Sequence, residues 1–264
     1  MKTGVTEDLL GIPISTRTMS ETIQTIRNWI GADKPRQIAT ANLDFLRMAR
    51  SNTDLLSCLR EADMVTADGM PLLWLARLKG HRIKERVAGS DMMKPLFDAA
   101  AQEGWRIYFL GGAKGTAKAA AKKAVEEFPN LQVAGAESPM VDLEDIEKLG
   151  QIVQRIRDAR CELLFVGLGC PKQEFFLRDH LAQTGAKVGI GVGGSFDFIA
   201  GSKSRAPKIL RMLGLEWGFR WLQEPRRLSS RYLRNIAILP LLAATIIRNR
   251  IQLGVGVQSI APPK

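Results

Sequence analysis

The chain has 264 residues, of which 45% are hydrophobic and 25% charged, and these proportions favour a folded globular protein over a disordered one. Its three widely spaced cysteines and two solitary histidines form neither a disulfide framework nor a zinc pattern, which favours a reducing cytoplasm. The first fifteen residues lack a basic region followed by an apolar core, so we expect no signal peptide. No apolar run reaches the length of an ordinary membrane span.

The net charge of +11 is unevenly distributed along the chain. From residue 201 onward there are twelve Lys or Arg and two acids, a net charge of +10, which leaves +1 for the first 200 residues. We therefore predict two domains: a nearly neutral body, residues 1–200, and a basic C-terminal segment, residues 201–264. Such asymmetry points to a nucleic acid, an anionic membrane surface or a multiply charged ligand.

Within the body, short apolar runs alternate with helical patterns. A first helix is predicted over 20–30, with Ser20 as its cap. Strands are predicted over 36–40, 64–66, 106–110, 163–166 and 188–192, each followed by a short turn and a helix. A further strand over 131–134 has a weaker pattern. This alternation predicts an α/β fold with a Rossmann-like, mainly parallel sheet and flanking helices.

Parallel topology brings the strand-to-helix turns to one edge of the sheet, where open α/β folds bind ligands. Helix N-termini at that edge suit a phosphate. The polar residues and glycines expected there include Thr40, Asn42, Asp68, Gln173, Gly193 and Asp197. The Gly111–Gly115 turn fits neither the dinucleotide fingerprint nor a P-loop.

Structural explanations compete with functional ones at these positions. Asp68 precedes a glycine and could simply form a turn, or it could act as a general base facing a substrate cleft. Asp197 could cap its local turn, and Arg86 could be a solvated charge. Gln173 carries a neutral amide that can fix a sugar or a base.

The C-terminal segment predicts a basic, amphipathic helical appendage. A helix is expected from Pro207, with an apolar face formed by Leu210, Leu213, Trp217 and Trp221. Arginines follow at helical spacing, and a helix would align Arg227, Arg231 and Arg234. The apolar run 236–247 is too short to span a bilayer, and arginines 248 and 250 follow it. It matches a segment lying in the membrane interface, although a helix packed on the body would show a similar run.

No Asp-x-Asp pair occurs in the chain. A carboxylate site for a divalent cation that grips a diphosphate is therefore not expected. If the protein moves a group from a nucleotide diphosphate, arginines and helix N-termini would hold the leaving charge.

Several spaced motifs resemble the WecG/TagA/CpsF glycosyltransferase family over roughly residues 10–250. They are Thr40–Asn42, Ala67–Pro71, Arg86–Asp91, Gly167–Glu174, Gly193–Gly201, Arg205–Pro207, Gly214–Trp217 and Glu224–Arg227. The resemblance implies an inverting, metal-independent transferase, without a cofactor, at the inner face of the cytoplasmic membrane. It implies transfer of N-acetylmannosamine or its uronate from a UDP donor to a polyprenyl-diphosphate-linked N-acetylglucosamine, for surface polysaccharide or teichoic-acid-type assembly.

The same resemblance assigns roles to residues. Asp68 would deprotonate the acceptor hydroxyl. Thr40, Asn42 and Gln173 would position sugars, and the arginines of the C-terminal segment, Arg220, Arg227 and Arg231, would bind diphosphate. We add Arg86, Gly193 and Asp197 of the body as substrate-binding candidates. We expect that segment to dock on the membrane and close over the site, excluding water from the donor. The oligomeric state stays open, a homo-oligomer included.

Two other functions compete with this interpretation. A nucleotide-dependent oxidoreductase would need a dinucleotide fingerprint and an acidic partner for the ribose, and neither is convincing here. An RNA-binding protein would interleave aromatic side chains among its basic ones. The aliphatic run 236–247 favours lipid instead, so we expect no nucleic-acid partner.

Overall fold

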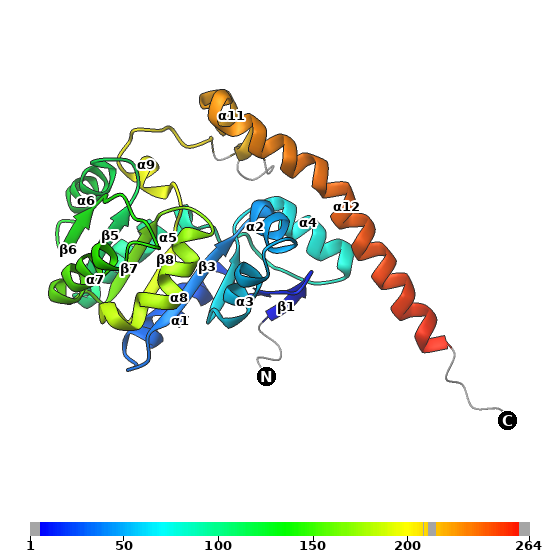
Figure 1. Ribbon diagram of the computed structural model, residues 1–264, viewed down its shortest axis with the longest axis horizontal. Coiled ribbons are helices and arrows are strands. Elements are labelled where there is room, and N and C mark those ends of the chain that lie inside the picture. Colours follow the sequence, from blue (N-terminus) through cyan, green and yellow to red (C-terminus); the bar gives the residue numbers. More distant parts are fainter. Residues whose placement is uncertain (1–5, 208, 211–214, 259–264) are drawn as a thin grey trace.

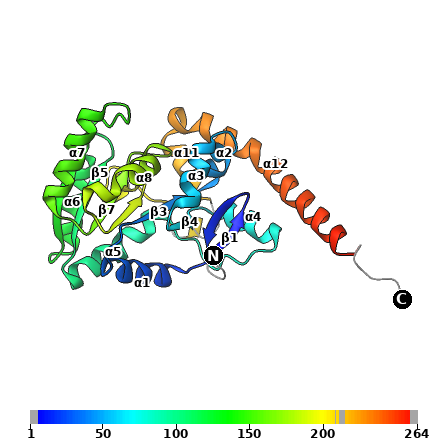
Figure 2. The same ribbon diagram turned by 60° about the horizontal axis from the view of Figure 1, so that its bottom comes forward.

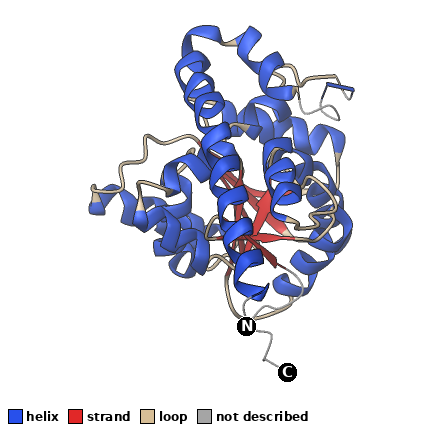
Figure 3. Cartoon of the chain, turned by 90° about the vertical axis from the view of Figure 1, so that its right-hand side faces the viewer, coloured by secondary structure: helices blue, strands red, loops and turns tan. Residues whose placement is uncertain are grey.

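The computed structural model describes residues 6–207, 209–210 and 215–258. At its centre lies an eight-stranded sheet with helices on both faces (Figures 1 and 3). All neighbouring strands are parallel except for one antiparallel pair, β1 with β2. In spatial order the strands are β1 (Thr6–Leu9), β2 (Ile12–Ser15), β4 (Met64–Ala67), β3 (Arg36–Ala41), β8 (Val188–Gly191), β7 (Leu163–Gly167), β5 (Arg106–Gly111) and β6 (Gln132–Glu137). The predicted α/β fold with a mainly parallel sheet is confirmed.

The first two strands were not predicted. β1 and β2 form a hairpin whose two turn residues, Leu10 and Gly11, have φ values of 56° and 90°, the left-handed conformation that tight hairpins require. Each strand is only four residues long and β2 contains Pro13, so the alternating pattern that marks a strand is too short to recognise. The weakly patterned strand is confirmed as β6.

The described residues of the body form nine helices: α1 (Met19–Ile30), α2 (Leu43–Ala49), α3 (Thr53–Glu61), α4 (Met70–Lys79), α5 (Gly89–Glu103), α6 (Thr116–Glu127), α7 (Ile146–Ala159), α8 (Lys172–Thr184) and α9 (Ser195–Ile199). The predicted cap at Ser20 is wrong. Thr18 is the N-cap, because its hydroxyl accepts from the Glu21 N–H at 3.2 Å and the Glu21 carboxylate accepts from the Thr18 N–H at 2.7 Å. This reciprocal pair is a capping box.

The two faces of the sheet bury separate hydrophobic clusters. One face packs against α1, α5, α6 and α9, and the other against α2, α3, α4, α7 and α8. On the first face an aromatic cluster includes Phe109 and Phe196, whose ring centroids lie 5.4 Å apart. Because Phe196 is fully buried, it fixes the short helix α9 and the glycine turn before it.

The helix predicted from Pro207 does not run through to Trp221. Leu215 is non-helical and caps α11 (Glu216–Gln223), while Leu213 lies outside the described residues. None of the α11 side chains is buried, so its apolar face is only partly covered. Trp217 packs edge-on against Tyr232 of the following helix, with ring centroids 6.0 Å apart.

The last helix, α12 (Pro225–Gln258), is 34 residues long and continues through Pro240. It runs along α2 and α4, and its C-terminal part extends past the body (Figures 1 and 2). Leu242 and Ile246 are buried against the α2–α4 side, whereas Leu233, Ile236, Leu241 and Ile247 are exposed. By length and composition alone, the 23 residues Leu228–Arg250, of which 17% are buried, could cross a membrane. The twelve-residue apolar run did not predict a helix of this length.

Candidate active site

A cavity of about 950 Å³ lies at the carboxyl edge of the sheet, between the strand-to-helix turns and the helices α11 and α12. Nine of the predicted site residues line it: Thr40, Asn42, Asp68, Arg86, Gln173, Gly193, Asp197, Arg220 and Arg231. The side chain of the tenth, Arg227, lies outside the described part of the chain. Parallel topology therefore gathers the predicted residues of the strand-to-helix turns as expected, and α11 and α12 add Arg220 and Arg231.

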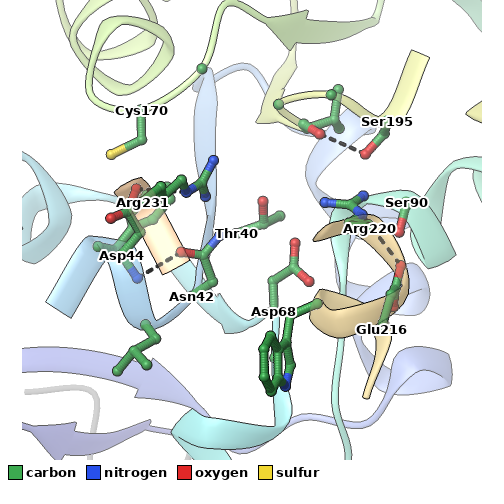
Figure 4. Close-up of a pocket in the computed structure, with 18 of the residues that line it drawn as sticks. Thr40, Asn42, Asp44, Asp68, Ser90, Cys170, Ser195, Glu216, Arg220 and Arg231 are labelled. Carbon is green, nitrogen blue, oxygen red and sulfur yellow. Dashed lines mark hydrogen bonds and ion pairs between the residues drawn. The ribbon is translucent and has the colours of Figure 1, made fainter. Parts of the chain in front are cut away.

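Asp68 follows β4 and is held there by its backbone N–H, which donates to the Ala41 carbonyl at 2.7 Å. Its side chain is 28% exposed and points into the cavity between Asn42 and Arg220 (Figure 4). Its carboxylate lies 4.0 Å from the guanidinium of Arg86. Burial raises the pKa of Asp68 to about 6, although Arg86 and Arg220 act in the opposite direction. A carboxyl group that titrates near neutrality is well matched to accepting a proton from a substrate hydroxyl.

Thr40 and Asn42 both make bonds that shape the site. The Thr40 hydroxyl donates to the Gly191 carbonyl at 2.7 Å and so links β3 to β8. The Asn42 side-chain oxygen accepts from the Asp44 N–H at 2.9 Å and caps α2. Because the cap uses the amide oxygen, the amide nitrogen of Asn42 is the atom with which it would meet a ligand.

Gln173 lies at the start of α8 and joins two turns of the site. Its amide oxygen accepts from the N–H groups of Gly169 and Gly193, at 3.1 and 3.0 Å. Its amide nitrogen donates to Glu174 at 2.8 Å, and the side chain is only 2% exposed. In this arrangement Gln173 shapes the cavity by linking the turn after β7 to the turn after β8.

Arg86 and Arg205 form an ion-pair network that reaches from the body to α11. Arg86 pairs through one guanidinium nitrogen with Asp91, and through the other with Glu216 at 3.2 Å. Arg205 pairs with Asp91 at 2.7 Å and donates to the Ser90 hydroxyl at 3.0 Å. The default interpretation of Arg86 as a solvated charge is therefore wrong: it is a partly buried, paired residue.

Two further ion-pair groups surround the cavity. Lys203 bridges Asp197 at 2.6 Å and Glu224 at 3.1 Å. On α12, Arg231 lies 3.0 Å from Asp44 of α2. Together with the Arg86 network, these pairs connect the C-terminal segment to the body at the rim of the site. The Arg220 guanidinium lies over the Phe198 ring, 4.5 Å from its centroid, in a cation–π arrangement.

Several residues that line the cavity were not predicted: Trp74, Ser90, Lys172, Lys203, Glu216, Tyr232 and Asn235. Trp74 is 42% exposed, whereas its neighbours Leu73 and Leu75 are buried. A large aromatic residue off the apolar face of the predicted helix is a signal that could have marked it as a site residue. Glu216 could have been singled out as one of two acids in a strongly basic segment. Lys172 carried no such signal: its ammonium group donates to the Val141 carbonyl at 2.7 Å, a contact between distant segments.

Charged side chains of both signs line the cavity. The cations are Arg86, Lys172, Lys203, Arg220 and Arg231, and the carboxylates are Asp44, Asp68, Asp197, Glu216 and Glu224. Among the described residues no three His, Cys, Asp or Glu side chains cluster as metal ligands would. A carboxyl group whose pKa is raised to about 6, at the carboxyl edge of a parallel sheet and beside two arginines, is the kind of site that α/β enzymes use.

Comparison with known sequences specifies the family. The Glycosyl transferase WecG/TagA/CpsF family matches residues 7–252, nearly the whole chain. The protein belongs to this family and is a glycosyltransferase. Membership confirms the resemblance found in the sequence and decides against the oxidoreductase and RNA-binding alternatives.

Curated relatives share much of the chain's length. A Bacillus subtilis protein is 28% identical over 244 residues, which cover 92% of this chain and 91% of the relative. A Bacillus spizizenii protein is 30% identical over 199 residues, covering 75% and 76%. A Staphylococcus aureus protein is 29% identical over 224 residues, covering 84% and 86%. Each is named N-acetylglucosaminyldiphosphoundecaprenol N-acetyl-beta-D-mannosaminyltransferase.

Proposed function

We propose that this glycosyltransferase moves N-acetylmannosamine, or its uronate, from a UDP donor to a polyprenyl-diphosphate-linked N-acetylglucosamine. The product would enter assembly of a surface polysaccharide or a teichoic-acid-type polymer. The names of the relatives support the sugar and the lipid acceptor. The observation that carries the proposal is the position of Asp68, which follows β4 and lines the cavity beside Arg86 and Arg220; its raised pKa of about 6 suits a base.

In the proposed reaction Asp68 removes the proton from an acceptor hydroxyl. The acceptor oxygen forms a bond to the anomeric carbon of the donor sugar from the opposite side to the leaving group. The bond from that carbon to the diphosphate oxygen breaks, and its electron pair leaves with UDP. The anomeric configuration inverts, and the proton on Asp68 passes to water. At pH 7 a carboxyl group of pKa about 6 is mostly ionised and ready to accept this proton.

Arginines would hold the charge that develops on the departing diphosphate. Arg220 and Arg231 line the cavity from the C-terminal segment, and we propose that Arg227, one turn before Arg231, joins them. The N-terminus of α8, at Lys172, also lies at the cavity and carries the positive end of the helix dipole. Fixed cations and dipoles aimed at a leaving diphosphate stabilise the transition state without a metal ion.

The remaining predicted residues would position the two sugars. Asn42 has its amide nitrogen available for a hydroxyl. Thr40, Gln173 and Gly193 would act through the shape of the turns they fix. Asp197 and Arg86, each held in an ion pair, would present polar groups at the rim.

An apolar part of the cavity suits the lipid acceptor. Met70 and Trp74 of α4 face the same cavity as Ile236 and Leu239 of α12. We propose that the exposed indole of Trp74 stacks on the acceptor sugar, and that the aliphatic residues meet the first isoprene units of the lipid.

The C-terminal segment would also place the enzyme on the membrane. The exposed apolar residues Leu233, Leu241 and Ile247 of α12 accompany the exposed arginines 248 and 250. A helix with apolar residues and cations on its surface binds an anionic membrane interface. We therefore propose a peripheral protein on the inner face of the cytoplasmic membrane, with the segment acting as a separate, membrane-associating domain.

A panel of UDP-sugars tests this function directly. Each sugar is incubated with the full chain and a polyprenyl-diphosphate-N-acetylglucosamine analogue, and the product is identified by mass. We expect product with UDP-N-acetylmannosamine or its uronate. Absence of product with every UDP-sugar would overturn the proposal. Product from another UDP-sugar alone would correct the donor and retain the reaction class.

A further inference from the structure

Three carboxylates surround one guanidinium at the edge of the cavity. Arg86 directs one nitrogen to Asp91 and the other, Nη1, to Glu216 at 3.2 Å and to Asp68 at 4.0 Å. The side chains of Arg86 and Glu216 are each 16% exposed, so water screens their interaction only partly. Of the two carboxylates near Nη1, that of Glu216 is the closer, and that of Asp68, the proposed base, is the more distant.

Glu216 differs from the other two carboxylates in where it comes from. Asp68 and Asp91 belong to the body, whereas Glu216 is the first residue of α11. It also lies 3.8 Å from Arg220, one turn further along the same helix. Docking of α11 therefore introduces both a cation and a carboxylate beside Asp68.

The contact between Arg86 and Glu216 has a consequence for Asp68. A guanidinium in direct contact with a carboxylate strongly favours its ionised form and makes it a weaker base. We infer that Glu216 is a positioning residue, which holds the Arg86 guanidinium away from Asp68 so that the carboxylate of Asp68 stays available for the acceptor proton. This inference rests on the proposed function only in taking Asp68 as the base.

The charges around Asp68 agree with this arrangement. The groups that face it are Arg86 from the loop before α5, Asp91 on α5, and Glu216 and Arg220 on α11. The two cations and two anions are balanced. Removing the charge of Glu216 leaves the cations in excess and frees Arg86 Nη1 to approach Asp68. Both changes lower the pKa of Asp68 and would make it a weaker base.

The decisive measurement is a pH titration of Asp68 in the full chain. Carboxyl ¹³C signals of labelled aspartate are followed by NMR, and the Asp68 signal is assigned by its loss in Asp68→Asn. In Glu216→Gln we expect the pKa of Asp68 to fall by about one unit. Glu224→Gln is the matched control, because it removes the other carboxylate of the same segment, which pairs with Lys203 and not with Arg86. It should leave the titration of Asp68 in place.

Turnover supplies a second readout. The acid limb of the pH profile of kcat/KM should move to lower pH in Glu216→Gln, with an about threefold slower rate at neutral pH because the base is weaker. Glu216→Asp, which keeps the charge, should restore most of the wild-type profile. Circular dichroism checks that each variant is folded.

The outcomes separate the inference from the function. An unchanged or raised pKa of Asp68 in folded Glu216→Gln overturns the inference even if the wild-type enzyme turns over normally. If no UDP-sugar is turned over, the proposed function fails, and the NMR titration still decides whether Glu216 controls Asp68. A shift of equal size in Glu224→Gln would also overturn the inference, because it would reflect net charge and not the contact with Arg86.

Discussion

The body and the C-terminal segment build the same cavity in different ways. In the body, polar groups at the site are bonded to the backbone of neighbouring turns, as Thr40 is to Gly191 and Gln173 to Gly169. Helix α11 buries none of its side chains and reaches the cavity through charged residues held in ion pairs. Hydrogen bonds buried in the body are costly to break, whereas partly exposed ion pairs are weak and sensitive to salt. The body therefore fixes the shape of the cavity, and the C-terminal segment contributes charged side chains that are held by weaker contacts.

The largest expected effect concerns the body. Asp68→Asn removes the proposed base with little change in volume, and we expect kcat to fall by about 10²–10⁴-fold. UDP release with the lipid acceptor analogue measures the rate. The melting temperature should not drop, because the described contact of this side chain is a 4.0 Å ion pair. Turnover at the wild-type rate would remove Asp68 from the mechanism.

The corresponding change in the C-terminal segment is Arg220→Ala. Loss of one cation from the proposed diphosphate site should lower kcat/KM by about 10²-fold, with normal folding because α11 has no buried side chain. Arg157→Ala removes the same charge from the exposed surface of α7, away from the cavity, and serves as the control. Equal losses in both variants would mean that net charge matters and the position of Arg220 does not.

A smaller effect is expected from pH. Because burial raises the pKa of Asp68 to about 6, the group is ionised above that value and takes up a proton as the pH falls through it. The base is active only when ionised, so kcat/KM should fall about tenfold for each pH unit below 6. A profile that stays flat down to pH 5 would contradict the raised pKa or the role of the residue.

The smallest effect concerns the acceptor side. Trp74→Ala should raise KM for the lipid acceptor by about three- to tenfold, which corresponds to the loss of one aromatic contact, and leave KM for the UDP-sugar unchanged. Trp74→Phe keeps an aromatic ring and should retain most of the affinity. If KM for the donor rises instead, Trp74 belongs to the donor side of the cavity.

The sequence predicted the sheet and the gathering of site residues because both follow from local patterns. Apolar strands followed by glycine-containing turns imply parallel topology, and parallel topology places Asp68, Gln173 and Asp197 at one edge. The sequence could not predict which polar side chains at this edge are engaged in hydrogen bonds within the protein. Gln173 was expected to meet a sugar, and the structure engages its amide with two glycine N–H groups, a contact set by the distance between two turns.

The C-terminal segment was harder to predict for a physical reason. Ion pairs such as Arg86–Glu216 join residues 130 positions apart and leave no periodic pattern in the sequence. The break at Leu215 and the continuation of α12 through Pro240 both differ from what local helix preference predicts, since a proline usually ends a helix. Composition indicated the basic character of the segment but not its length or its contacts.

The two acids of the C-terminal segment give its docking a defined register. Twelve cations are attracted to any anionic surface, and such attraction hardly distinguishes one seating of the helices from another. Glu216 pairs with Arg86 of the body, and Glu224 pairs with Lys203, which in turn pairs with Asp197 of the body. Either carboxylate would be repelled if a carboxylate or phosphate stood in the place of its cation. Discrimination between partners often depends on such repulsion. Two negative charges among twelve positive ones thus select one productive seating from many of similar attraction.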